Sequence, residues 1–376
     1  MRIAIQAADL DADRIDGTRV YILNCLKYFG KLDPSSDFLI YHKHNFNPEL
    51  TPPSFPNYQI IKKTLPYFWT QTRFAGHVWK EKPDVLWMPM HNMPVIKKKG
   101  LKTVVTIHDL AFKYFPETFT KKDLWKINFL TRLAVTHADK IITISQSSKK
   151  DILKFYPKVK PENIQVISHG FDKELYSTGR NAEKENQVRK KYGISGPYLI
   201  YIGAIQPRKN LEKLVEAFEI LKKSELNSDL KLVLVGEKAW LSESIFKKIE
   251  NSPNKKDIIC PGRVCFDELV SLLQGADVFA FPSVYEGFGI PILEAMASRV
   301  PVVCANNSSL PEVGGEAVLY FDGNSSADLA DNISKILESS ELKKDLIEKG
   351  LEQIKKFSWE KTARETLEYL KSLGQA

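Results

Sequence analysis

Two glutamates with seven residues between them are the side chains in this sequence best suited to chemistry. Residues 286–294 read Glu-Gly-Phe-Gly-Ile-Pro-Ile-Leu-Glu. Gly287 and Gly289 can adopt positive φ, and the proline that follows suits the first turn of a helix. Such a turn directs free N–H groups and the positive end of the helix dipole at an anion. With Glu286 before the turn and Glu294 in the first helical turn as hydroxyl acceptors, the segment suits a nucleotide sugar. The alternative is a structural strand-turn-helix.

A pair of adjacent cations supplies the charge that a diphosphate needs. Gly203 closes an apolar strand, and Arg208 and Lys209 follow before a predicted helix, with Asn210 in an N-cap-like position. Arginine can contact a phosphate with two parallel hydrogen bonds, and lysine adds a compact point charge. Both cations are therefore predicted to lie at the C-terminal end of a strand and to bind a diphosphate. A solvated surface pair is the alternative.

Three further candidates follow strands in the first half of the chain. His108 could donate a hydrogen bond to a substrate hydroxyl, and Asp109 could accept one. Ser145 is predicted mainly to cap the next helix, with exposure to a cleft as its second possibility. Gly17, in a strand-loop-helix connection after Asp16, resembles a phosphate loop with a single glycine. For His108, Asp109 and Gly17 an ordinary structural role is the alternative.

Apolar strands alternate with amphipathic helices along the chain, which is typical of parallel α/β sheets. Strands are predicted in the first half at residues 2–7, 38–42, 59–62, 85–88, 102–107, 140–144 and 164–167, and in the second at 198–202, 231–235, 258–260, 278–281, 301–304 and 317–320. Helices are predicted at residues 19–29, 124–137, 145–155, 211–221, 267–273 and 359–373. A turn-rich linker is predicted at 172–185, after a hinge at Gly170. Residues 45–56 and 66–80 are expected to be loops that determine acceptor specificity. Ligands bind at the C-terminal ends of such strands, so a cleft between two facing units is the expected site.

Positive charge is concentrated in the first half. Residues 1–172 carry 26 Lys and Arg against 16 Asp and Glu, whereas the rest of the chain is close to neutral. Aromatic residues at 67, 68, 69, 74 and 79 lie among the basic clusters. A surface of this kind could contact anionic lipid headgroups or nucleic acid, or be a solvated face over buried aromatics. Of the two binding interpretations we favour peripheral contact with an anionic membrane, with a solvated face as the alternative, and we expect no nucleic-acid partner.

The remaining bulk features favour a cytoplasmic protein. The first residues run directly into strand-like sequence without the apolar region of a signal peptide, and no apolar run approaches a membrane span. Four cysteines, without a metal-binding spacing, are expected to be buried thiols. No Asp-x-Asp pair stands at a strand end in the middle of the chain, so no metal site and no cofactor are predicted.

Together these segments resemble retaining glycosyltransferases of family 4, which have the GT-B fold. Residues 281–297 are very close to the Glu-x7-Glu signature of that family, and residues 201–203 and 208–211 resemble its diphosphate segment. Residues 301–303 and 309–313 continue the match, which in the first half covers His108-Asp109 and the order of strands and helices. Residues 357–360 open a tail helix similar to the one that crosses back onto the N-terminal domain in such enzymes.

The resemblance implies roles for the candidate residues. The predicted catalytic group is Glu286, which would bind hydroxyls of the donor sugar, with Arg208, Lys209 and His108. The two cations would neutralise the departing nucleotide, and His108 would face the sugar from the other domain. Donor contacts are predicted at Gly203, Gly287, Phe288, Gly289, Ile290 and Gly17, with Glu294 on the ribose. Asp109 and Ser145 would lie near the acceptor or support the site. Many relatives carry a glycine pair where this chain has Asp16-Gly17.

The resulting prediction is an α/β protein of GT-B type, with two doubly wound Rossmann-like domains facing across a cleft. Residues 1–172 with the helix 359–376 would bind a saccharide or lipid-linked saccharide acceptor, and residues 173–358 the nucleotide sugar. The reaction would transfer a hexose with retention and without a metal, in cell-surface polysaccharide or glycolipid synthesis. Residues 107–152 are most similar to bacterial mannosyltransferases, which favours GDP-mannose. A UDP-hexose donor and a non-catalytic sugar-nucleotide-binding subunit are the alternatives.

Overall fold

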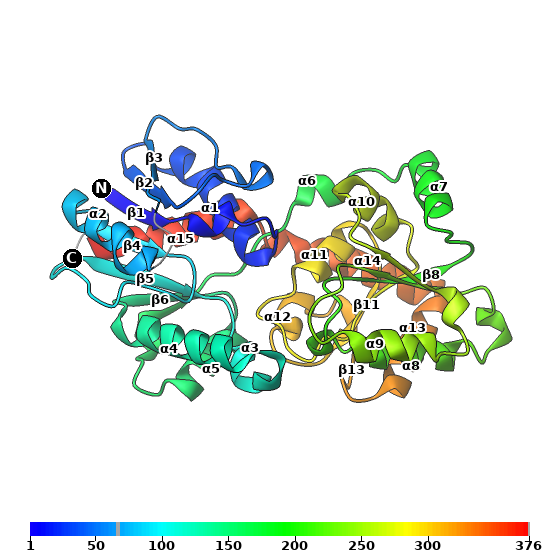
Figure 1. Ribbon diagram of the computed structural model, residues 1–376. Helices are drawn as coiled ribbons and strands as arrows, with labels where there is room; N and C mark the ends of the chain where they lie inside the picture. The colour runs from blue at the N-terminus through cyan, green and yellow to red at the C-terminus, as the bar shows by residue number, and fades with distance from the viewer. Residues whose placement is uncertain (65–67, 375–376) are drawn as a thin grey trace. The chain divides into compact units, whose positions relative to one another are not determined.

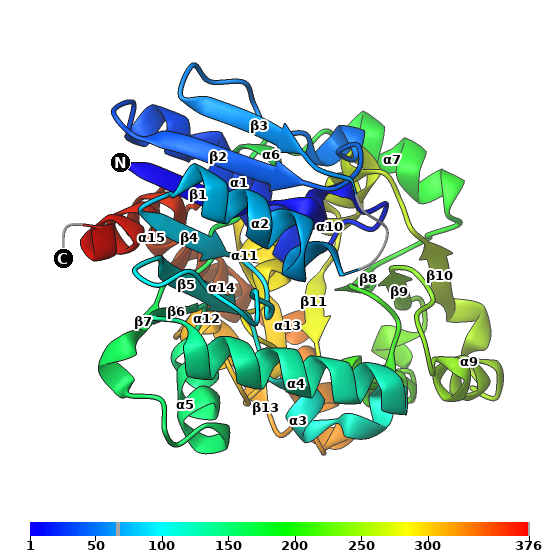
Figure 2. The ribbon, with the colours of Figure 1, turned by 60° about the vertical axis from the view of Figure 1, so that its left-hand side comes forward.

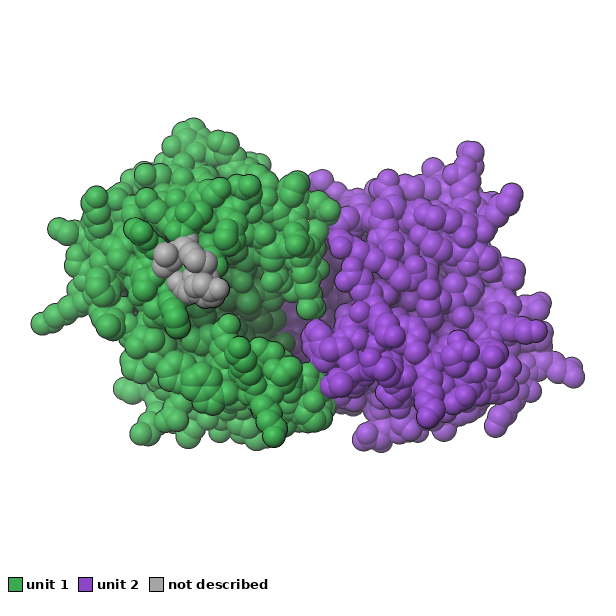
Figure 3. All heavy atoms as spheres, in the orientation of Figure 1, with its two compact units in different colours: residues 1–170, 357–376 green, residues 171–356 purple. Residues whose placement is uncertain are grey.

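The protein is described at residues 1–64 and 68–374 by a computed structural model, in which the chain forms two compact units (Figure 3). The first unit comprises residues 1–170 and 357–376, and the second comprises residues 171–356. The boundaries drawn from sequence, after residues 172 and 358, fall two residues further along the chain. Tyr67, one of the aromatics in the predicted basic surface, and the last two residues of the predicted tail helix lie outside the described residues.

Seven parallel strands form the sheet of the first unit, in the order β3-β2-β1-β4-β5-β6-β7. Their bounds are β1 Arg2–Gln6, β2 Asp37–His42, β3 Tyr58–Lys62, β4 Val85–Met88, β5 Lys102–Ile107, β6 Lys140–Thr143 and β7 Ile164–Val166. Both β2 and β4 pair with β1, so the chain winds outward from β1 in both directions. This is the doubly wound arrangement predicted, and each predicted strand is found within one residue of its expected bounds.

Helices connect these strands, and one returns from the end of the chain. They are α1 Gly17–Leu32, α2 Arg73–Glu81, α3 Ala111–Tyr114, α4 Lys121–His137, α5 Gln146–Phe155 and α15 Trp359–Gly374. α15 packs along α1, and the two lie side by side in both ribbon views (Figures 1 and 2). The tail helix therefore belongs to the first unit although the whole second unit precedes it in sequence.

The second unit repeats the arrangement with six parallel strands in the order β10-β9-β8-β11-β12-β13. The strands are β8 Tyr198–Ile202, β9 Lys231–Val235, β10 Ile258–Gly262, β11 Val278–Phe281, β12 Val302–Ala305 and β13 Val318–Phe321. Its helices are α6 Lys173–Tyr176, α7 Ala182–Lys191, α8 Leu211–Leu221, α9 Glu243–Glu250, α10 Phe266–Gln274, α11 Ile290–Ala297, α12 Leu310–Gly314, α13 Ser326–Glu338 and α14 Ser340–Gln353. Two Rossmann-like units are thus confirmed.

Three expectations from sequence are corrected by the fold. Residues 66–80, expected to be a loop, contain most of α2, because Phe74, Ala75 and Val78 are buried at helical spacing. The linker predicted at 172–185 includes α6 and the start of α7. Two of the four cysteines, Cys260 and Cys265, are exposed, whereas Cys25 and Cys304 are buried.

Gly170 stands where the chain leaves the first unit, and close packing accounts for it. A Cβ atom at this position would lie 2.1 Å from the backbone nitrogen of Trp359, at the start of α15. Gly170 has no positive φ. The glycine is therefore needed so that the returning chain can approach, which is a different reason from the change of direction expected from sequence.

Candidate functional site

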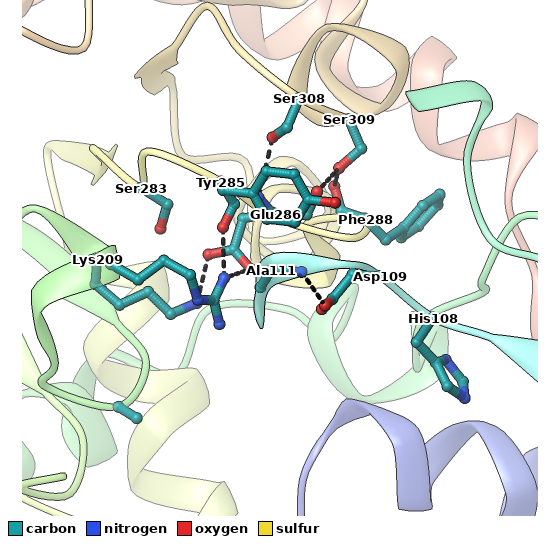
Figure 4. A network of polar contacts seen from close by, with 12 residues as sticks. His108, Asp109, Ala111, Lys209, Ser283, Tyr285, Glu286, Phe288, Ser308 and Ser309 are labelled. Carbon is teal, nitrogen blue, oxygen red and sulfur yellow. Dashed lines mark hydrogen bonds and ion pairs between the residues drawn. The ribbon is translucent and has the colours of Figure 1, made fainter. Parts of the chain in front are cut away.

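Glu286 lies between the two predicted cations in the second unit. It follows β11, while Arg208 and Lys209 form the turn Pro207–Lys209 after the neighbouring strand β8. The Nη1 atom of Arg208 is 3.1 Å from one carboxylate oxygen, and Lys209 Nζ pairs with the other (Figure 4). All three side chains are less than 20% exposed. The parallel sheet thus brings together residues that are more than 75 positions apart.

Electrostatics keep this carboxylate charged. Burial alone would favour the neutral acid, but the adjacent charges of Lys209 and Arg208 lower the pKa of Glu286 to about 2. The cluster carries one net positive charge at neutral pH. Nη1 of Arg208 also donates to the carbonyl of Tyr285. Lysine has three N–H donors and arginine has five, so each cation can donate to more than one acceptor.

Two serines after β12 fix the loop that carries Glu286. Ser308 Oγ accepts a hydrogen bond from the Glu286 N–H at 3.0 Å, and Ser309 Oγ donates to the carbonyls of Glu286 and Phe288 at 2.9 and 2.7 Å (Figure 4). Ser309 is fully buried. The sequence analysis gave these serines no role, because their contacts cross from one βα loop to the next.

The glycine-rich turn leads into α11 as predicted, but the two glycines differ. Gly289 has φ of +117° and precedes the first helical residue, Ile290, whereas Gly287 has no positive φ. The side chain of Phe288, between them, is buried. α11 therefore begins four residues after Glu286. Pro291 in its first turn has no N–H, and the Ile292 N–H donates to the carbonyl of Gly289 at 3.0 Å.

Glu294 lies in the second turn of α11, not in the first turn as expected, so the helix dipole contributes less to its charge. Its side chain is half-buried. Burial raises the pKa of Glu294 to about 7, against a hydrogen bond from the hydroxyl of Tyr176 that favours the charged form. Tyr176 ends α6 and is buried. This partner was missed from sequence.

Two residues in the loop after β8, Gly203 and Asn210, adopt positive φ. Gly203 has φ of +152°, and a Cβ atom there would lie 2.6 Å from the hydroxyl of Tyr201. Asn210 occupies the N-cap position of α8 but adopts a left-handed conformation, and its side chain does not cap the helix. It donates instead to the carbonyl of Gly323 at 2.8 Å.

In the first unit, His108 is buried at the end of β5 with His91 beside it. His108 Nε2 lies 2.9 Å from the carbonyl of Pro89, so that nitrogen carries the proton, and Nδ1 makes no hydrogen bond within the described residues. Burial lowers the pKa of His108. The neutral ring therefore presents an acceptor at Nδ1, which corrects the donor role expected for it. His91 Nε2 accepts from the His108 N–H at 2.9 Å, a contact that sequence reasoning missed.

The other predicted residues of the first unit have visible structural tasks. Asp109 accepts from the Ala111 N–H at 2.9 Å and so shapes the start of α3 (Figure 4). Ser145 is buried and caps α5 by accepting from the Ser148 N–H. Gly17 begins α1, where the Asp16 carboxylate caps the helix through the Arg19 N–H. A substrate contact for each of these residues stays a prediction.

No candidate metal site is found in the part of the chain that the structure describes. Within it, no group of three or more His, Cys, Asp or Glu side chains is placed to hold a metal ion. The same residues include no helix long and apolar enough to cross a membrane. Metal-independence stays a prediction.

Comparison with known proteins matches each half of the chain to a family model. Residues 15–175 match the model described as Glycosyltransferase Family 4, and residues 184–353 match Glycosyl transferases group 1. The O-antigen chain mannosyltransferase B of Escherichia coli is 31% identical over 273 residues, which cover 72% of this chain and 71% of that protein. The serotype-specific mannosyltransferase WbdA of the same species is 29% identical over 77% of this chain, but the match spans only 35% of WbdA.

A solved structure extends the similarity to nearly the whole chain. HepE of Anabaena, in complex with UDP and glucose, superposes with a TM-score of 0.75 at 18% identity, covering 99% of this chain and 100% of HepE. At that identity the likeness concerns the fold, and the sequence matches carry the family. The chain therefore belongs to glycosyltransferase family 4, and its two Rossmann-like units are those of a GT-B glycosyltransferase.

Proposed function

We propose that this glycosyltransferase moves a hexose, with mannose favoured, from a nucleotide sugar to a saccharide or lipid-linked saccharide acceptor with retention of configuration. The synthesis of a cell-surface polysaccharide or glycolipid is the process in which it would act. The observation that carries the proposal is the cluster of Arg208, Lys209 and Glu286 beside the start of α11. It combines donors for a diphosphate with a charged acceptor for sugar hydroxyls.

The chemistry follows from the charges of this cluster. In the transfer, the bond between the anomeric carbon and the diphosphate oxygen breaks, and a bond from the acceptor hydroxyl oxygen to that carbon forms. The hydroxyl proton passes to the departing phosphate. Negative charge grows on the diphosphate, and preorganised cations at Arg208 and Lys209 stabilise it more in the transition state than in the ground state. Glu286, charged at neutral pH, orients the sugar by accepting hydrogen bonds.

The donor is proposed to be GDP-mannose, since the Escherichia coli relatives are named as mannosyltransferases. A UDP-hexose is the second candidate, because HepE, which has the same fold, was solved with UDP and glucose. Within the site, Glu294 is proposed to accept hydrogen bonds from the ribose hydroxyls, which both donors share. No cofactor or metal is proposed for the transfer.

A donor panel tests the function directly. GDP-mannose, UDP-glucose and other nucleotide hexoses would be screened for an increase in Tm, and those that bind would be assayed for sugar transfer to membrane-extracted glycolipid. We expect transfer from one donor, and a Glu286→Ala variant that loses transfer while its Tm still rises with nucleotide. Unchanged transfer by that variant would show that Glu286 has no part in the reaction.

Peripheral contact with an anionic membrane, at the cytoplasmic face, is proposed as well. The exposed face of α4 supports it: Trp125 and Phe129 are 70% and 48% exposed, and their rings stack at 5.6 Å. Exposed basic residues surround the pair, namely Lys121, Lys122, Lys126 and Arg132. Aromatic rings suit the headgroup region, and each basic residue near an anionic surface contributes about 1 kcal/mol. The aromatics expected from sequence fit less well, because Trp69 and Phe74 are buried.

Vesicle sedimentation tests this contact. We expect the protein to sediment with vesicles containing phosphatidylglycerol more than with phosphatidylcholine alone, and less so at high salt. The double substitution Trp125→Ala and Phe129→Ala should reduce sedimentation, and Phe266→Ala, an exposed aromatic of the second unit, should not. Equal sedimentation of the double variant and the wild type would exclude α4 as the contact surface.

A further inference from the structure

A polar pocket of about 600 Å³ lies in the second unit beside the catalytic cluster and contains none of the predicted site residues. It is formed by the loops that follow β11, β12 and β13 at the C-terminal edge of the sheet. Its polar lining includes Asn306, Asn307, Tyr320, Asp322, Asn324 and Asp328. The volume lies within the range of about 300–1,000 Å³ typical of small-molecule sites.

The charge of the lining restricts what can bind. Two carboxylates, Asp322 and Asp328, line the pocket, and none of its described lining residues is Lys, Arg or His. Phosphate and other anions would be repelled without a compensating cation. The cationic cluster around Glu286 is proposed to bind a diphosphate, so the two neighbouring sites differ in the class of ligand they suit.

Some polar side chains of the pocket are held by hydrogen bonds, and others make none to the described residues. Asp328 accepts from the Asp322 N–H at 2.8 Å and from Asn332, so its position is set. The side-chain amides of Asn306 and Asn324 make no hydrogen bond to any described residue, and both residues are exposed. Amides and carboxylates together can donate to and accept from a ligand that carries many hydroxyl groups.

A chain of hydrogen bonds joins this pocket to the catalytic loop. Asn307 donates to the carbonyl of Ser283 at 3.1 Å and accepts from Ser308 Oγ at 3.1 Å. Ser308 Oγ in turn accepts from the Glu286 N–H. A second hydrogen bond connects the pocket to the loop that carries Arg208 and Lys209. Asn210 of that loop donates to the carbonyl of Gly323, which lines the pocket after β13. A ligand here would therefore lie at a defined position relative to Glu286.

We propose that this pocket is a saccharide subsite, which holds a neutral, hydroxyl-rich part of the acceptor or product glycan while its end is at the catalytic cluster. The inference rests on the proposed function, because a glycan that is extended needs a second point of contact. The acidic lining disfavours anionic groups, and the amides beside the carboxylates suit hydroxyl groups, which a neutral saccharide supplies. The volume and the spread of amides across two loops suit a sugar of several units.

Saturation-transfer NMR with two defined probes, mannotriose and maltotriose, tests the subsite on the full chain. We expect one probe to bind the wild type at millimolar concentration. Loss of hydrogen bonds in the double variant Asn306→Ala with Asn324→Ala should weaken that binding by about tenfold. Asn251→Ala, another exposed asparagine of the same unit, is the matched control and should bind like the wild type.

Nucleotide binding, followed as the rise in Tm with GDP or UDP, should be the same in all of these variants. The proposal is overturned if neither trisaccharide binds the wild type, or if the double variant binds the probe equally well. Loss of the nucleotide-induced rise in the double variant would instead mark a nucleobase pocket. Failure of the proposed function gives a different result, namely saccharide binding without sugar transfer from any donor.

Discussion

At the residue scale, we expect the charge of Glu286 to have two effects. It contributes to the free energy of unfolding, and it takes part in binding the ligand. Arg208 and Lys209 are largely buried against it, and removing one partner of a buried ion pair leaves uncompensated charge. For Glu286→Gln we expect a loss of about 1–3 kcal/mol in the free energy of unfolding and a fall of about 10²–10³ in kcat. Chemical denaturation and steady-state kinetics measure the two effects.

A nucleoside diphosphate should restore part of the stability of this variant. Its negative charge would replace that of Glu286 between the cations, so Tm should rise more in Glu286→Gln than in the wild type. Glu237→Gln, which removes an exposed ion pair with Arg263 at 3.5 Å, is the control and should change stability by less than about 0.5 kcal/mol. An equal rise in Tm in all three proteins would contradict a diphosphate site at the cations.

Glu294 should make stability depend on pH. Its pKa is about 7 in the folded protein, against 4.5 for an ordinary glutamate, so the folded state binds more protons between these values. Stability from this group is therefore lost as pH rises from about 5 to 7. We expect Glu294→Gln to become more stable relative to the wild type over that interval, as measured by urea denaturation at several pH values.

The matched control is Glu316→Gln, at an exposed position of the same unit. Its stability relative to the wild type should not change over the same interval. If Glu294→Gln also shows a constant difference from the wild type, the carboxyl is charged throughout, and burial beside Tyr176 does not control it.

Sequence reasoning singled out individual candidate residues, but it did not find their partners. Glu286, Arg208 and Lys209 stand in recognisable local contexts, a glycine-rich turn and a strand end. Their mutual ion pairs depend on β8 and β11 being neighbours in the sheet, which no local pattern encodes. The contacts of His91 with His108 and of Tyr176 with Glu294 were missed for the same reason. The protonated nitrogen of His108 was also out of reach, since a backbone carbonyl decides it.

At the scale of the element, the start of α11 depends on Gly289. Its φ of +117° is strained for any L side chain, and a Cβ atom would lie 3.0 Å from Leu310. We expect Gly289→Ala to cost about 1–3 kcal/mol of stability and to weaken nucleotide binding, because the first turn of the helix would shift. Thermal unfolding and nucleotide titration give these two quantities.

Gly76 offers a direct comparison within a helix. It lies in α2, without positive φ, and a Cβ atom there would meet nothing within 4 Å. Gly76→Ala should therefore stabilise the protein by about 0.5–1 kcal/mol. If Gly289→Ala behaves in the same way, the loop adapts to a side chain and its conformation is not required.

The elements that sequence predicted are those with a strong apolar pattern. Strands buried on both faces read as short apolar runs, and each of them was found within two residues of its expected bounds. The helices that were missed are more polar or lie in segments expected to be loops, as α2 and α7 do. In α7 only Glu185 and Val188 are buried, so little periodicity is visible. Whether such helices form depends on tertiary packing, which local sequence patterns do not show.

At the scale of the whole molecule, two units of similar design share one chain that leaves the first unit and returns to it. The repeated strand order explains why the fold class was predictable, since each half carries the same alternation of strands and helices. The return through α15 followed only from the resemblance of residues 357–360 to the family. The contribution of α15 to the stability of the first unit can be measured.

The substitution Leu370→Ala in α15 tests that contribution to stability. Leu370 is fully buried, and α15 packs against α1, β4 and β5, so the substitution should cost about 2–5 kcal/mol. Alanine keeps the helix intact, which confines the effect to packing. Hydrogen exchange followed by mass spectrometry should show lost protection in residues 1–170 and unchanged protection in residues 171–356. Leu226→Ala, at a leucine that is 87% exposed, should change neither. Equal loss in both units would mean that they unfold as one cooperative structure, with α15 stabilising the second unit as much as the first.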